Sequence, residues 1–162
     1  MRAYGLIHTS FWTDRKFQLL SLTAKTLALY LLSGPHTTML GCFRLPAGYV
    51  GEDLQISLET VSQGLNELLA KGFITRDEAT GWTVIPNFLR WNPIENPNQG
   101  KSVINLFQQV PEDNPIYPDI VAVLLKFNQH LPGDFINRLQ TLSEGFLNQE
   151  QEQEQEQEQE QE

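Results

Sequence analysis

The segment between Leu20 and Trp91 constrains the fold most, because it combines amphipathic helical patterns with strand-like runs in a distinctive order. Apolar residues recur at helical spacing over residues 22–32, and Ser33-Gly34-Pro35 then has the Gly-Pro signature of a helix end. Residues 41–45 alternate like a short strand, and Pro46 can open a short helix that runs to Leu54. The pattern therefore predicts a helix, a short strand and a second helix.

A third helix is predicted over residues 58–71, after a tight turn at Gln55-Ile56. Ser57 is a suitable N-cap for it, and Gly72 is a suitable residue to end it. Apolar residues at positions i, i+4, i+7 and i+8 form one stripe, which indicates a helix with one buried face. The stripe consists of Val61, Leu65, Leu68 and Leu69.

The next segment has the pattern of a β-hairpin. Residues 73–76 and 82–85 are rich in β-branched and aromatic residues, and the polar loop between them ends in Gly81. Helices followed by such a hairpin are typical of the winged helix-turn-helix, usually a DNA-binding fold. The sequence thus predicts an α+β, mainly α chain with a winged helix-turn-helix domain at 1–94, a linker at 95–102, a helical extension at 103–147 and a disordered Gln/Glu tail at 148–162.

The C-terminal part of the chain contains further helical patterns. Residues 92–100 are rich in Pro, Asn and Gly, which is typical of a linker. Three amphipathic stretches separated by prolines follow, at 103–110, 119–131 and 134–147. Their apolar faces can pack on the winged helix or form an interface with a second copy, since repeated or palindromic DNA sites are usually bound by paired readers.

The chain ends in an uninterrupted alternation of Gln and Glu from Gln149 to Glu162. Glu at every second position places like charges at i and i+4 on any helix, and a segment without apolar residues has nothing to bury. We therefore expect this tail to be disordered. It can act as a solubilising spacer, or it can compete with phosphate for basic side chains.

The net charge of −9 arises mostly in this tail. Seven of the 20 acidic residues lie there, so residues 1–148 carry 13 acidic and 11 basic residues. Since neutralisation of phosphate by Lys and Arg supplies most of the affinity for DNA, any DNA contact must rest on local clusters. The candidate cations are Arg15-Lys16, Lys25, Arg44, Lys71, Arg76 and Arg90.

The outward face of the predicted helix 58–71 has side chains suited to DNA. Gln63 and Asn66 can pair with adenine edges in the major groove, and Thr60 can contact a phosphate or a thymine methyl group. Glu59 and Glu67 lie on the same predicted face and repel phosphate unless they accept from a cytosine amino group. An ordinary polar helix face is the alternative. The candidate DNA-binding residues are Ser57, Glu59, Thr60, Gln63, Asn66, Lys71, Arg76, Arg44 and Lys25.

Catalytic and metal-binding motifs are not evident in the sequence. His8, His36 and His130 are far apart and have no Cys or His neighbour at ligand spacing. Gly100-Lys101-Ser102 resembles the end of a phosphate loop, but Glu95 stands where that motif needs glycine. We therefore expect a protein that is not an enzyme and that uses no metal or cofactor.

The location of the protein can be predicted from what the sequence lacks. A single cysteine, Cys42, cannot form an internal disulfide, and the N-terminus has no apolar core of a signal peptide. No apolar run approaches the roughly 20 residues of a membrane span. These features predict a cytoplasmic protein that does not bind membranes.

Several short motifs together resemble a known family. They are Phe11-Trp12-Thr13-Asp14, Leu20 to Lys25, Leu29 to Thr37, Gly41 to Pro46, Asn66-Glu67-Leu68, Gly72-Phe73-Ile74 and Asn87 to Asn92. In this order, over roughly residues 4–102, they resemble the N-terminal winged-helix domain of bacteriophage replication initiation proteins. That family is similar to replication protein O and to helicase-loading organiser proteins.

This resemblance implies a function and partners. In the family, the winged helix recognises repeats at the phage origin, and a separate C-terminal part recruits the host replicative helicase or its loader. The resemblance implies that DNA contacts in this chain lie in residues 57–71 and in the hairpin at 76–82. By this resemblance the expected partners are double-stranded origin DNA and the helicase or loader of the bacterial host. A second copy in a homodimer is the further partner expected from the apolar faces of the helical extension. Two alternatives remain open: a winged-helix transcriptional regulator, and a replisome protein-interaction module that does not read bases.

Overall fold

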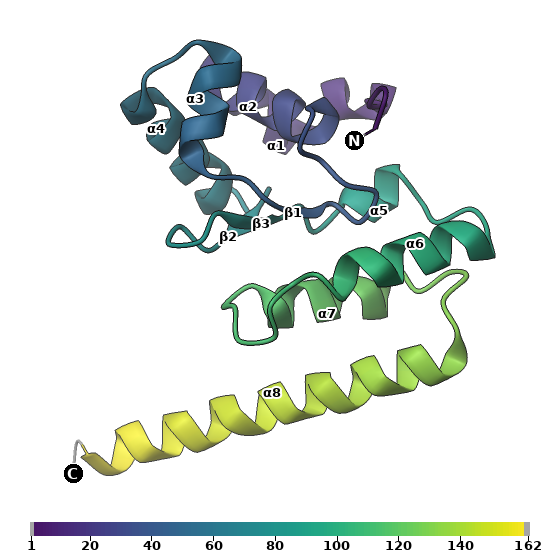
Figure 1. Cartoon of the computed structure of the whole chain (residues 1–162). Helices are drawn as coiled ribbons and strands as arrows, with labels where there is room; N and C mark the ends of the chain where they lie inside the picture. The colour runs from purple at the N-terminus through teal and green to yellow at the C-terminus, as the bar shows by residue number, and fades with distance from the viewer. Residues whose placement is uncertain (1, 161–162) are drawn as a thin grey trace.

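The computed structural model describes residues 2–160 (Figure 1). It is mainly helical, with one small antiparallel sheet, which confirms the predicted α+β, mainly α class. The elements are η1 (Thr9–Thr13), α1 (Arg15–Gln18), α2 (Leu22–Ser33), β1 (Cys42–Arg44), α3 (Ala47–Leu54), α4 (Leu58–Ala70), β2 (Thr75–Arg76), β3 (Trp82–Val84), α5 (Phe88–Trp91), α6 (Pro97–Phe107), α7 (Tyr117–Lys126) and α8 (Gly133–Glu160).

The sheet lies between two helical layers (Figure 1). Helices α1 to α4 cover one side, α6 and α7 cover the other, and α8 packs on the outside of α7. The strand order is β1-β3-β2, so the hairpin strand β3 is central and pairs antiparallel with both neighbours. Val84 is opposite Cys42 on one side and Thr75 on the other. The short strand before α3 is thereby tied to the hairpin after α4.

Helix α4 is held by caps at both ends. The Ser57 hydroxyl accepts a hydrogen bond from the Thr60 N–H (3.1 Å), as the sequence predicts for an N-cap. At the other end Gly72 adopts a left-handed φ of +70°, and the N–H groups of Gly72 and Phe73 donate to the carbonyls of Leu69 and Leu68. This end is a Schellman motif, in which a glycine has no Cβ penalty.

Helices α2 and α4 pack closely because Gly64 faces Leu27. A Cβ atom on Gly64 would lie 2.1 Å from the Leu27 side chain, which is itself fully buried. The turn between α3 and α4 is made by Gln55 with a φ of 54°, at the position predicted for it. These contacts fix the direction in which α4 presents its polar face.

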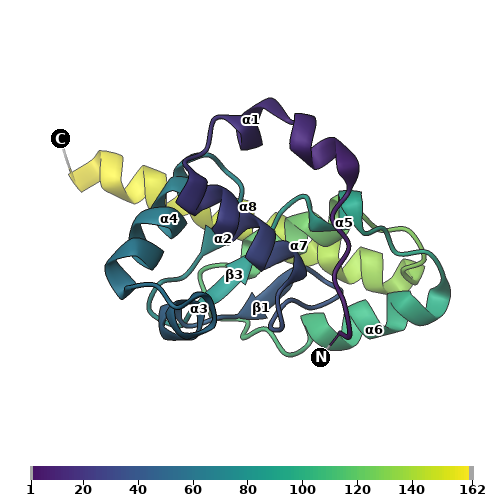
Figure 2. The ribbon, with the colours of Figure 1, turned by 90° about the horizontal axis from the view of Figure 1, so that it is seen from above.

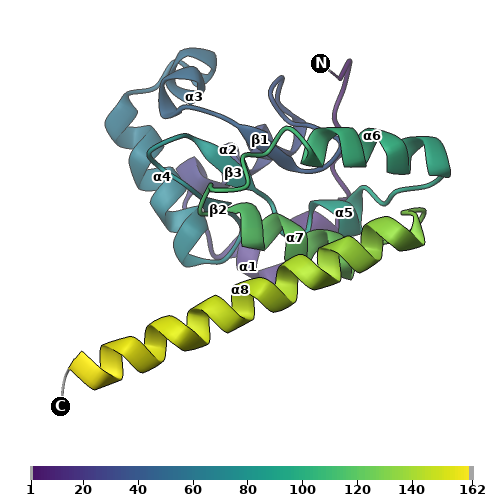
Figure 3. The ribbon, with the colours of Figure 1, turned by 60° about the horizontal axis from the view of Figure 1, so that its bottom comes forward.

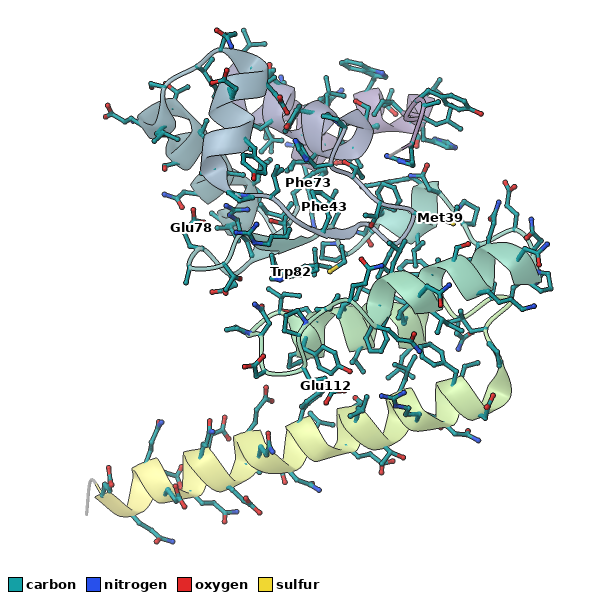
Figure 4. All side chains as sticks on the ribbon, viewed as in Figure 1. Met39, Phe43, Phe73, Glu78, Trp82 and Glu112 are labelled. Atoms are coloured by element: carbon teal, nitrogen blue, oxygen red, sulfur yellow. The ribbon has the colours of Figure 1, made fainter. Side chains whose placement is uncertain are left out.

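One hydrophobic core extends through both layers. Buried residues of α2, α4 and the sheet form a single cluster with those of α6, α7 and α8. Figure 4 shows Phe43 and Phe73 in the upper layer and Met39 above α6. Burial and, to a lesser degree, the Asp119 carboxylate of α7 raise the pKa of the Cys42 thiol to about 12, because α7 lies near β1. The helical extension therefore packs back on the N-terminal layer.

Several predicted boundaries in the C-terminal half differ from the structure, where the helices span Pro97–Phe107, Tyr117–Lys126 and Gly133–Glu160. The predicted linker at 95–102 is wrong, because α6 begins at Pro97, with the Asn96 side chain accepting from the Gln99 N–H (3.0 Å). Proline is favourable at the first helical position, so a composition typical of a loop here opens a helix. Gly100 then allows close packing, since a Cβ atom there would lie 2.3 Å from the His130 carbonyl oxygen.

The predicted disordered tail is not confirmed. Helix α8 continues through the Gln/Glu repeat to Glu160, and every side chain from Asn148 to Glu160 is exposed. Gln and Glu have high intrinsic helix propensity, and a helix already nucleated by packing on α7 needs only to propagate. In Figure 3 the C-terminal half of α8 extends beyond the rest of the molecule.

Among the helices of residues 2–160, none combines the length and apolar character that crossing a membrane requires.

Candidate nucleic-acid interface

The exposed face of α4 presents two unpaired amides. Gln63 and Asn66 are both exposed, are one turn apart, and make no hydrogen bond to another of the described side chains or backbone groups. Ser57 and Thr60 lie at the start of the same helix, with their hydroxyl oxygens 2.9 Å apart. The helical pattern predicted this orientation correctly, and it leaves the donors and acceptors of both amides free for a ligand.

Glu67 lies on the flank of α4, where it caps helix α2. Its carboxylate accepts from the Ser21 N–H (2.8 Å) and from the Ser21 hydroxyl (2.6 Å). These hydrogen bonds lower the pKa of the Glu67 carboxyl, with a smaller contribution from Lys71. Glu67 therefore keeps its negative charge while its carboxylate is held by Ser21, and its repulsion of phosphate stays a prediction. Glu59 remains exposed in the first turn of α4.

A Glu67→Gln variant is expected to lose a pH-dependent part of the stability. A carboxyl whose pKa is lowered by folding stabilises the fold above its unfolded pKa, and this contribution is lost as the pH falls through the folded pKa. The melting temperature of the variant should thus lie below that of the wild type at pH 7, and the gap should narrow below about pH 4. Thermal unfolding from pH 3 to pH 7 tests this, with exposed Glu144→Gln on α8 as the control. A gap that stays constant with pH would contradict it.

Arg76 is a structural residue, contrary to its prediction as a DNA contact. Its side chain is only 1% exposed. Nη1 donates to the carbonyls of Leu45 (2.7 Å) and Gly81 (3.2 Å) and to the Thr83 hydroxyl (2.8 Å), and Nε donates to Glu78 (2.8 Å). Figure 4 shows Glu78 at the outer end of the hairpin. This arginine therefore joins the hairpin to the segment after β1 and is not free for a phosphate.

The remaining predicted cations are spread over different elements. Arg44 is exposed at the end of β1, opposite Trp82 in the register. Lys25 lies on α2 with its Nζ 5.9 Å from the centre of the Phe17 ring. Lys71 is exposed at the C-terminal end of α4. The structure thus groups Ser57, Glu59, Thr60, Gln63 and Asn66 on α4 but does not bring Arg44, Lys25 and Lys71 onto that face.

A polar cluster fixes α3 against α2. The Asp53 carboxylate accepts from the Tyr30 hydroxyl and lies 3.2 Å from His36 Nε2. Tyr49 stacks on the His36 ring, with 5.5 Å between ring centres. Burial and the Asp53 contact raise the pKa of Tyr30. Within residues 2–160 no three His, Cys, Asp or Glu side chains are close enough to hold a metal ion.

No family model, curated protein or solved structure matches this chain. What it binds must therefore be inferred from its own residues.

A feature that the sequence does not reveal is a pocket between α1, the C-terminal end of α4 and α5. Lys16 and Lys71 both line it, together with aromatic side chains of three elements. Lys16 was among the candidate cations, but nothing in its local sequence places it beside Lys71. The pocket arises from tertiary packing of residues that are more than 50 positions apart in the sequence.

Proposed function

We propose that this chain is a winged helix-turn-helix protein that binds duplex DNA through α4 in the initiation of phage replication. The observation that supports this most is the pair of free amides, Gln63 and Asn66, on the exposed face of a helix held rigidly by α2 and α3. The order of α2, α3 and α4 before the β2–β3 hairpin, with β1 pairing to β3, is the arrangement expected of this fold. In the proposal α4 is the recognition helix and the hairpin is the wing.

The chemistry of α4 supports reading of bases more than binding of phosphates. An amide side chain can donate to adenine N7 and accept from the N6 amino group at once, so two adjacent amides suit an adenine-containing site. The cations available for phosphates nearby are few, since Arg76 is buried and Lys71 lies at the far end of α4. We therefore propose a site-specific reader whose non-specific affinity is low and whose salt dependence is shallow.

The place of this binding in replication rests on the family resemblance. By that resemblance the DNA is an origin with repeated sites, and the partners are the host replicative helicase or its loader. A homodimer fits repeated half-sites, because each copy presents a single α4. Binding in the bacterial cytoplasm belongs to the same proposal. A transcriptional regulator of the same fold would instead prefer a promoter operator and would not contact a helicase.

Fluorescence anisotropy tests the proposal directly. A labelled duplex from the neighbourhood of the encoding gene is compared with a scrambled duplex at about 50 and 200 mM salt. A preference of roughly 10³ for one duplex supports specific reading. Each of the variants Gln63→Ala and Asn66→Ala should then weaken specific binding by about 1–3 kcal/mol, or roughly 5- to 150-fold, and leave scrambled binding unchanged.

Matched controls are available on α8 and at the end of α4. Gln140→Ala and Asn137→Ala remove exposed amides far from α4 and should leave the affinity unchanged. Lys71→Ala should weaken binding to both duplexes equally if Lys71 contacts phosphate. Equal binding to both duplexes by the wild type, or none at low salt, would reject base reading by α4.

A protein-interaction module is the second candidate, and one observation favours it. Leu58 and Tyr49 are 59% and 51% exposed at the α3–α4 end of the molecule, with the exposed carboxylates of Glu52 and Glu59 on the same two helices. Apolar side chains among acidic ones suit a basic protein surface more than a phosphate backbone. Failure of DNA binding in the anisotropy experiment would favour this candidate.

A further inference from the structure

The pocket between α1, α4 and α5 has an aromatic floor and a cationic rim. The rings of Phe11 and Phe17 lie 4.2 Å apart, and the Trp91 ring lies 5.5 Å from Phe11 and 6.2 Å from Phe73. All four rings line the pocket. Phe73 and Trp91 are half-buried and offer the apolar surface that a ligand would contact, and the buried rings of Phe11 and Phe17 lie behind them. Lys16 and Lys71 stand at its edge.

The cations around this pocket are unpaired. None of Lys16, Lys71 and Lys25 has a carboxylate within 4.0 Å among residues 2–160, although Lys25 lies over the ring of Phe17. Asp14 also lines the pocket, where its Oδ1 accepts from the Phe17 N–H (3.0 Å) and caps α1, so the described lining carries one carboxylate against two lysines. An apolar pocket with free cations fits an acidic segment that also offers an apolar side chain.

The chain itself contains such a segment in α8. Leu147 is 56% exposed, since it points away from α7 while its neighbour Phe146 packs on Tyr117. Glu150, Glu154 and Glu158 follow at helical spacings of three and four residues, so their side chains share a face with Leu147 within about 80°. This face offers one apolar anchor followed by a row of three carboxylates, none of which is paired within the described chain.

The pocket and this face of α8 are on opposite sides of the same molecule. Helix α1 lies in the layer above the sheet, and α8 lies below α7 (Figure 1). Viewed from above, α1 is at one edge of the molecule, and the end of α8 continues outward past α4 (Figure 2). A straight α8 cannot reach the pocket of its own chain, whereas the α8 of another copy can.

We propose that the acidic face of α8, formed by Leu147, Glu150, Glu154 and Glu158, docks in the α1–α4–α5 pocket of a second copy of this chain. Leu147 contacts the aromatic floor, and the carboxylates pair with Lys16 and Lys71 and with nearby Arg15 and Lys25. The two surfaces differ, so the contact is heterologous. If two copies each dock α8 in the pocket of the other, they form a dimer. If each copy docks α8 in the pocket of the next copy, longer assemblies form.

Sedimentation equilibrium of the full chain without DNA tests this contact. At about 20 mM salt, where charges are weakly screened, the mass should exceed the 18.5 kDa of one chain and rise with concentration. At about 500 mM salt it should return to that of one chain. A single-chain mass at all concentrations in low salt would overturn the proposal.

The alternating repeat supplies a matched control. The triple variant E150Q/E154Q/E158Q should weaken self-association at least tenfold, and so should K16E/K71E in the pocket. The triple variant E152Q/E156Q/E160Q removes the same charge from the other side of α8 and should keep the association within twofold. Equal weakening by both triple variants would overturn the proposal, because it would mean that only net charge matters.

Charge reversal on both sides gives a positive test. A mixture of K16E/K71E with E150K/E154K/E158K should form a mixed assembly, although neither variant associates alone. All of these side chains are exposed or at the pocket edge, and circular dichroism identifies any variant that does not fold. Absence of the mixed assembly between folded variants would overturn the pairing of these two surfaces.

Discussion

Replacing Arg76 with alanine is expected to lower the free energy of unfolding by about 3 kcal/mol, because several buried acceptors then lose a charged donor. The carbonyls of Leu45 and Gly81 and the Thr83 hydroxyl all accept from this one guanidinium, whose side chain is 1% exposed. For a chain of this size the melting temperature should fall by roughly 10 °C. Thermal and urea unfolding measure both quantities.

Two further substitutions sharpen this prediction. Arg76→Lys keeps the charge but cannot reproduce the geometry of a guanidinium, so most of the loss should remain. Arg90→Ala removes an exposed arginine of α5 and should change the stability by no more than about 0.5 kcal/mol. If R76A proved as stable as R90A, the role of Arg76 in joining the hairpin to the segment after β1 would be rejected.

Gly41→Ala is expected to be more damaging still, with a loss of about 4 kcal/mol or more, because left-handed strain and overpacking add. Gly41 has a φ of +71°, and a Cβ atom there would lie 2.4 Å from Cβ of Phe88. Phe88 is 0% exposed in the core, so it has no space into which to move. Urea unfolding with an unchanged m-value would measure the loss.

Gly72 provides the matched comparison. Its φ of +70° is almost the same, but a Cβ atom there would meet nothing within 4 Å. Gly72→Ala should therefore cost only about 1–2 kcal/mol, the penalty of a left-handed conformation. The difference between the two variants isolates the clash with Phe88. If the two variants lost the same free energy of unfolding, Phe88 would be able to move away from the new Cβ atom without cost, and the predicted clash would be contradicted.

The sequence predicts those helices whose ends are determined by residues within a few positions of them. Helix α3 has the predicted bounds, α4 lies within one residue of them, and the Ser57 cap and the left-handed Gly72 follow from rules that act within a few residues. Helix α6 was misread because the Pro and Asn that open it are also loop residues. The short helices α1 and α5 were missed, since four residues show no periodicity.

Within the candidate site, the sequence predicts correctly only the side-chain directions that follow from the helical pattern of α4. The outward direction of Gln63 and Asn66 follows from the buried stripe of α4. Glu67 accepts a hydrogen bond from Ser21, 46 positions earlier in the chain. Arg76 donates a hydrogen bond to the carbonyl of Leu45, 31 positions earlier. No local pattern reveals such partners, because they meet only when the layers assemble.

The continuity of the core restricts how this chain can be recombined with others. The buried Asn114 amide donates to Asp77 and Thr80 at the tip of the hairpin, 3.3 Å and 3.0 Å away, and thus joins the α6–α7 loop to the N-terminal layer. A chimera that kept residues 1–94 and received a foreign extension would lose this link and expose the sheet surface that α6 and α7 cover. If residues 1–94 and the helical extension were inherited separately, residues on both sides of the sheet would have to be substituted to restore the packing between them. The two helical layers and the sheet between them can therefore be exchanged only together. A binding site engineered on α8 stays joined to α4 through this common core.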